Sequence, residues 1–235
     1  MDKKIKIEML FPEFCNLYGD ISNIKYLRKC IPDAKYIETE FSKEPAFINE
    51  DVNFIYLGPM TEDMQEKVIK KLKQYKERIK ELIESNVIFL VTGNAMEIFG
   101  EYIENEDGSR IEGLSIFPIY SKRDMLNRHN SLFIGKYENI EILGFKSQFT
   151  FSYGDNSEDY FLEVEKGIGL NKESNLEGIK RNNFFATYLL GPILISNPLF
   201  TKKLIEKMGI DKVELAFEED AILAYNQRLS ELKKL

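Results

Sequence analysis

The sequence is poor in the residues on which many catalytic and metal sites depend. Its 235 residues include no tryptophan, one histidine and two cysteines. No group of His, Cys and acidic residues has the spacing of metal ligands, so we predict no metal and no other cofactor. The two cysteines, Cys15 and Cys30, do not make a disulfide framework, and we expect a reduced, cytoplasmic protein.

Long hydrophobic runs and an excess of positive charge are also missing. No stretch approaches the roughly 18 apolar residues of a membrane-spanning helix. Residues 1–7 alternate like a strand and lack the long apolar core of a signal peptide. Lys and Arg number 32 against 39 Asp and Glu, which gives a net charge of −7. We therefore predict no membrane span and no nucleic-acid partner.

The residues that are present predict one α/β domain over residues 1–235. Hydrophobic residues make up 43% of the chain, which is enough for a sizeable core. Strands are expected at residues 5–11, 34–39, 52–57 and 87–91, and helices at about 20–30 and from Thr61 to Ile83. Short apolar strands that alternate with helices indicate a mostly parallel central sheet with helical crossovers on its faces.

The second half of the chain has a different pattern. Short β segments are expected at residues 114–120, 132–137, 140–145, 149–153 and 161–164, and they suggest an added β meander. A further apolar strand is expected at 184–189. Two helices should follow, one from Asn197-Pro198 to about Met208 and one capped by Asp211.

The expected ligand site lies at the carboxyl ends of the parallel strands. The loops there are residues 11–20, 58–61, 92–95 and 189–192, and each contains Gly, Pro or Asn. The segment FLVTGNAMEIFG, residues 89–100, is a strand that turns sharply into a helical pattern through small residues. Many α/β enzymes present a nucleophile in this way, yet this turn contains neither Cys nor Ser.

No other pair of residues supplies a nucleophile and its base. His129 lies in the polar stretch 127–130 and is predicted to be a surface loop residue. Cys15 follows the first strand at the correct sheet edge, but no histidine stands at a comparable strand end. Cys30 lies on a helix and is expected in the core.

Several short motifs, in a fixed order, resemble one enzyme family. They are Asn16-Leu17-Tyr18-Gly19-Asp20 with Asn23-Ile24 and Leu27-Arg28, the turn at 91–100, Gly144-Phe145, residues 167–171 with 177–178, residues 187–192, and Asn197-Pro198. Together they resemble class I glutamine amidotransferases of the cobyric acid synthase type, and most closely the glutaminase subunit of lipid II isoglutaminyl synthase. The resemblance implies a flavodoxin-like fold, a cell-wall or cobalamin pathway, glutamine as ligand and a Mur-ligase-like partner.

This sequence differs from the family pattern at the positions that carry out the family's reaction. The position of the family's catalytic Cys is Gly93, and that of its catalytic His is Leu190. The Gly-rich oxyanion loop appears as Leu57-Gly58-Pro59-Met60, in which Pro59 has no N–H to donate. Glu97 replaces a Gln, and Lys146-Ser147-Gln148 replaces Glu-Asn-His. Because the family reaction proceeds through a glutamyl thioester on Cys, these changes predict that the glutaminase step is lost.

The first hypothesis is therefore a family member without catalytic residues that acts as a partner, scaffold or ligand-binding subunit. Its candidate ligand-binding residues are Arg128, Gly58, Asn94 and Thr92, with Arg128 as a carboxylate clamp from the family's placement of an Arg before this strand. A second hypothesis keeps an active glutaminase with an unrecognised nucleophile such as Cys15 or Thr92. A third is an interaction protein with no small-molecule site.

Overall fold

The computed structural model describes residues 4–235 and has a parallel sheet at its centre. The sheet consists of β1 (Lys6–Leu10), β2 (Lys35–Thr39), β3 (Phe54–Leu57), β4 (Ile88–Thr92), β13 (Ile179–Arg181) and β14 (Phe184–Thr187), in the order β13-β14-β4-β3-β1-β2. All neighbours are parallel except β13 and β14. This confirms the predicted α/β class with a mostly parallel central sheet.

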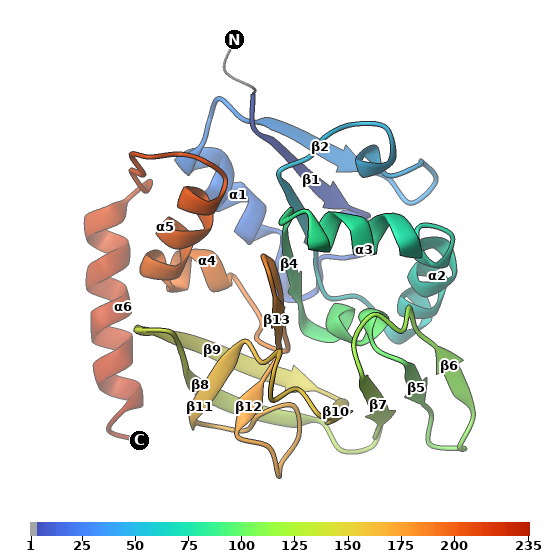
Figure 1. Ribbon diagram of the computed structural model, residues 1–235. Helices are drawn as coiled ribbons and strands as arrows, with labels where there is room; N and C mark the ends of the chain where they lie inside the picture. The colour runs from blue at the N-terminus through green and yellow to red at the C-terminus, as the bar shows by residue number, and fades with distance from the viewer. Residues whose placement is uncertain (1–3) are drawn as a thin grey trace.

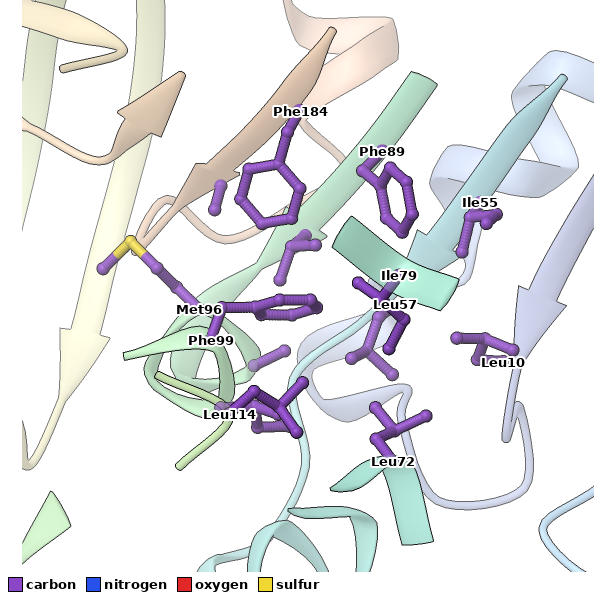
Figure 2. Close-up of a cluster of buried hydrophobic side chains, with 14 of the residues drawn as sticks. Leu10, Ile55, Leu57, Leu72, Ile79, Phe89, Met96, Phe99, Leu114 and Phe184 are labelled. Atoms are coloured by element: carbon purple, nitrogen blue, oxygen red, sulfur yellow. The ribbon is translucent and has the colours of Figure 1, made fainter. Parts of the chain in front are cut away.

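Helices cover both faces of this sheet, as Figure 1 shows. One face carries α1 (Ser22–Cys30), α4 (Ile193–Ser196) and α5 (Pro198–Lys207), and the other carries α2 (Glu62–Lys73) and α3 (Lys76–Glu84). Each face of the sheet packs against its helices in a separate hydrophobic core, and alternate strand residues point into one core or the other. Ile55 and Phe89 face α2 and α3, whereas Phe54 faces the opposite layer. Figure 2 shows the first of these cores, in which Phe184 and Phe99 pack edge to face at 4.9 Å.

The added β segments form two four-stranded sheets. One contains β5 (Tyr102–Glu104), β6 (Arg110–Glu112), β7 (Ile119–Arg123) and β10 (Thr150–Gly154), and the other contains β8 (His129–Tyr137), β9 (Ile140–Gln148), β11 (Leu162–Lys166) and β12 (Leu176–Glu177). The expectation of one meander was wrong, because β10 leaves its neighbour β9 and pairs with β7. The second sheet is backed by the C-terminal helix α6 (Glu218–Leu232) (Figure 1).

Several expected boundaries also differ. The helix expected from Thr61 to Ile83 is divided near Tyr75, whose ring packs on Phe47 at 6.1 Å. The last helix begins at Glu218 and not at Asp211, because Phe217 takes a left-handed conformation with φ of 56°. The stretch 114–118 is irregular, and its strand begins only at Ile119. The part of the expected N-terminal alternation on residues 1–3 lies outside the described residues.

Three short 3₁₀ helices complete the fold. They are η1 (Leu17–Gly19), η2 (Ala46–Ile48) and η3 (Gly93–Phe99). η3 is the helical part of the sharp turn after β4 and is completely buried apart from Asn94. None of the helices within residues 4–235 is both long and apolar enough to cross a membrane.

Candidate functional site

A pocket of about 180 Å³ lies at the carboxyl edge of the central sheet. The loops after β1, β3, β4 and β14 supply one side of it, and Arg128 just before β8 with residues 147–150 at the end of β9 supplies the other. The lining residues are Leu17, Tyr18, Pro59, Met60, Thr61, Glu62, Gly93, Asn94, Glu97, Arg128, Ser147, Gln148, Phe149, Thr150, Tyr188 and Leu190. Gly93 and Leu190, the positions predicted for the family's catalytic Cys and His, therefore line the same pocket.

The floor of this pocket has no room for a side chain at position 93. Gly93 has a φ of +60°, a backbone conformation that glycine adopts easily. A Cβ atom built there would lie 2.7 Å from Pro59 Cβ and 3.1 Å from Leu190 Cδ2. Pro59 and Leu190 thus converge on the Gly93 Cα, and the atoms nearest the point predicted for the family nucleophile are carbons.

The loop after β3 has few free hydrogen-bond donors. Pro59 has no N–H, and the Met60 N–H donates to Asn94 Oδ1 at 3.1 Å. Asn94 returns a bond from Nδ2 to the Met60 carbonyl at 2.8 Å. The predicted ligand residue Asn94 does line the pocket, but its side chain fastens this loop to the turn after β4.

Two further predicted ligand residues lie behind the pocket wall. Thr92 is completely buried, and its hydroxyl donates to Asp20, as does the hydroxyl of Tyr56. Asp20 is itself buried, which raises its pKa. Gly58 packs against the chain near Cys15, since a Cβ there would lie 2.4 Å from the Cys15 carbonyl oxygen. The Tyr18-Gly19-Asp20 motif therefore joins the first loop to β3 and β4.

A buried polar chain runs beneath the pocket and includes Glu97. One Glu97 oxygen accepts a bond from Gln65 Nε2 at 2.8 Å, and the other accepts one from the Tyr188 hydroxyl at 3.1 Å. Gln65 Oε1 accepts from Arg123 at 2.8 Å, and Tyr188 shares a bond with Ser152 at 2.7 Å. Burial is the main cause that raises the pKa of Glu97 to about 7.

The mouth of the pocket carries a positive charge. Arg128 is exposed and places its guanidinium 4.3 Å from the centre of the Phe149 ring. Within residues 4–235 this guanidinium has no carboxylate partner. Gln148, nine-tenths buried beside it, donates from Nε2 to the Thr150 carbonyl at 2.6 Å, while its Oε1 has no partner among the described groups.

Within residues 4–235, Cys15 and the histidine make no contact with each other. Cys15 is buried with its sulfur 3.8 Å from Met60 Sδ, and burial raises the pKa of its thiol. His129 is the first residue of β8 and not a loop residue as predicted; its Nε2 lies 3.1 Å from Ser131 Oγ. Burial lowers the pKa of His129. Across residues 4–235, no group of three or more His, Cys, Asp or Glu residues could hold a metal ion.

Sequence reasoning did not single out Gln65, Gln148 or Tyr188 as site residues. Gln65 lies within the predicted helix that begins at Thr61. Its amide donates to residues of η3 because α2 packs against η3. For Gln148, the one sequence signal was its place in the family resemblance, where it stands at the histidine of the Glu-Asn-His pattern. Its missing hydrogen-bond partner could be found only from coordinates.

The strand order and the pocket at the carboxyl edge define a class I glutamine amidotransferase fold. A solved structure described as a glutamine amidotransferase superposes with a TM-score of 0.59, at 11% identity, over 87% of this chain and all of its own. PurLQS from Thermotoga maritima superposes with a TM-score of 0.58, at 12% identity, over 88% of this chain and 98% of its own.

Sequence comparison gives the family. Residues 6–198 match the model for the CobB/CobQ-like glutamine amidotransferase domain, and the chain belongs to that family. It is similar to the GatD subunit of lipid II isoglutaminyl synthase (glutamine-hydrolyzing) from Staphylococcus aureus strain N315, at 29% identity over 88% of this chain and 85% of that protein. The GatD subunit from Streptococcus pneumoniae strain ATCC BAA-255 / R6 is 27% identical over 93% and 87%.

Proposed function

We propose that this chain is a family member that has lost glutamine hydrolysis and serves as a partner, scaffold or ligand-binding subunit. The observation that carries the proposal is the convergence of Pro59 and Leu190 on Gly93. Thioester chemistry needs a nucleophile and a group that moves its proton. Gly93 offers no atom for attack, and Leu190 offers no group that can take or give a proton.

The geometry around the alternative nucleophiles supports the same proposal. A thiol reacts as its thiolate, and the raised pKa of buried Cys15 keeps it protonated. Thr92 has a carboxylate neighbour in Asp20, but it is fully buried and lies outside the pocket lining. Neither residue presents its side chain to a ligand in the pocket.

A partner subunit is the second part of the proposal. Both relatives are named as subunits, and we infer that this chain also works in the cytoplasm beside a Mur-ligase-like protein. Large apolar side chains are exposed in loops next to the pocket: Phe14, Tyr18 and Leu126 have exposed fractions of 40%, 50% and 87%. Exposed apolar side chains in these loops are what a covering partner protein would bury.

The test is glutamate release from glutamine at high protein concentration, with and without a Mur-ligase-like protein from the same source. An active glutaminase of the family serves as the positive control, and Cys15→Ala as the matched variant. We expect no release above background in either condition. Release that survives purification would overturn the proposal, and its loss in Cys15→Ala would identify the nucleophile.

A further inference from the structure

We propose that the pocket binds a small carboxylate whose other end is apolar, in place of a ligand that ends in a carboxamide. The inference rests on the proposed loss of glutamine hydrolysis and names the ligand class that the altered pocket accepts. It follows from a difference between the two ends of the pocket. The floor is hydrocarbon and poor in free donors, whereas the mouth carries a cation and an unused acceptor.

The floor consists of side chains that attract an apolar group. Pro59 Cβ and Leu190 Cδ2 both reach the space above the Gly93 Cα, as their distances of 2.7 and 3.1 Å from an added Cβ show. Leu190 is held in place because its N–H donates to the Phe145 carbonyl at 2.9 Å. A ligand that extends to this floor therefore places its far end against carbon atoms.

Several hydrogen-bond donors near the floor are already engaged. The Met60 N–H donates to the Asn94 side chain, the Asn94 side chain donates to the Met60 carbonyl, and Pro59 has no N–H. The Gln65 amide donates to the Asn94 carbonyl at 2.6 Å and to Glu97 at 2.8 Å. The carboxamide end of a ligand would lose its hydrogen bonds to water and would find these protein donors already used. We therefore expect its affinity to be lower by about tenfold or more.

The mouth has the opposite character. The Arg128 guanidinium stacks on Phe149 and has no carboxylate partner within residues 4–235, so it is available to an anionic group. Gln148 is held by its bond to Thr150, and its Oε1 is an acceptor without a donor. A ligand carboxylate would pair with the Arg128 guanidinium, and a neighbouring N–H group of the same ligand would donate to Gln148 Oε1. An α-amino acid with an apolar side chain carries both groups.

The experiment compares matched amino acids by calorimetry and by the shift in thermal unfolding temperature. Norleucine and methionine carry unbranched apolar side chains of nearly the length of glutamine, and pentylamine is norleucine without its carboxylate. We expect norleucine and methionine to bind at least about tenfold more tightly than glutamine or glutamate, and pentylamine not to bind.

Two variants locate the contacts. Arg128→Met should weaken norleucine binding by at least about tenfold, because the carboxylate loses its cation. Leu190→Asn gives the floor donors and should reverse the preference toward glutamine. Leu223→Ala, at an exposed position on α6 far from the pocket lining, is the matched control and should bind like the original chain. Arg128 is exposed, so its variant remains informative even where Leu190→Asn fails to fold.

The ligand inference is overturned where glutamine binds as tightly as norleucine, where no amino acid binds, or where Arg128→Met leaves binding unchanged. Glutamate release is measured on the same preparation, so that the two proposals fail separately. A chain that hydrolyses glutamine contradicts the proposed function. A silent chain that prefers glutamine contradicts only the ligand class.

Discussion

At the scale of single residues, position 93 leaves little room for a side chain at the turn after β4. Gly93→Ala adds only a Cβ, and we expect it to lower the free energy of unfolding by roughly 2–4 kcal/mol. The left-handed backbone and the contact with Pro59 Cβ at 2.7 Å both oppose the new atom. Urea denaturation measures the difference, and Gly93→Cys should cost at least as much.

A double-mutant cycle separates the two causes. The cost of Gly93→Ala should be smaller in a Pro59→Gly background, because the nearest obstructing atom is then removed. Gly108→Ala is a useful control, since it has a φ of +82° but no neighbour within 4 Å of an added Cβ. Equal costs in both backgrounds would mean that Pro59 does not close the floor.

The second prediction at this scale concerns the pH dependence of stability. The pKa of Glu97 is about 7 in the folded chain against an ordinary 4.5, so the folded state keeps a proton that the unfolded state has released between these values. Stability should therefore fall by up to about 3 kcal/mol as the pH rises from 4.5 through 7.

Glu97→Gln keeps the contacts with Gln65 and Tyr188 but cannot ionise. Compared with the original chain, we expect it to lose this part of the pH dependence when urea unfolding is measured at pH 5 and pH 8. The original chain and the variant should be similar at pH 5, and the variant should be more stable at pH 8. Parallel pH curves for the two proteins would show that Glu97 does not titrate in this range.

At the scale of elements, a buried ion pair links β9 to β12 within the second added sheet. Lys146 Nζ donates to Glu177 Oε2 at 2.7 Å and to the carbonyls of Ile168 and Gly169. Glu177 Oε1 accepts bonds from Thr187 and from the Tyr188 N–H, each at 2.8 Å. Both side chains of the pair are fully buried. Lys146 thus holds Glu177 in place within the second added sheet, and the other oxygen of Glu177 bonds this sheet to the end of β14 in the central sheet.

Lys146→Met leaves the Glu177 carboxylate buried without its cation and should cost about 3–5 kcal/mol in urea denaturation. Lys203→Met is the matched control, because Lys203 pairs with Glu138 where both side chains are partly exposed, and it should cost about 1 kcal/mol or less. Similar costs for the two variants would mean that the buried pair does not fasten the sheets together.

The elements of the first half of the chain could be predicted, and several of the second half could not. The strands at 52–57 and 87–91 are short apolar runs between turn residues, so local pattern was enough. The partner of β10 could not be predicted, because pairing with β7 joins segments about 30 residues apart. The last helix, expected to be capped by Asp211, begins only at Glu218, because the left-handed backbone of Phe217 gives no signal in the local sequence pattern.

At the scale of the whole molecule, the central sheet gathers residues from distant parts of the sequence. Pro59, Gly93 and Leu190 follow β3, β4 and β14, which lie side by side in the sheet with their carboxyl ends at one edge. The β8–β9 pair then covers this edge and brings Arg128 and Gln148 to the pocket. The site thus depends on the relative placement of the central sheet and an added sheet.

The sequence by itself determined the α/β class and the family, because these follow from local patterns and motif order, and it predicts that both catalytic positions are replaced. Only the tertiary structure decided that Pro59 and Leu190 fill the space above Gly93 and that Asn94 and Gln65 are already bonded. It also placed Thr92 behind the pocket wall. The physical reason is that packing and hydrogen-bond satisfaction are properties of atoms brought together across the sheet, and the spacing of residues along the chain does not contain them.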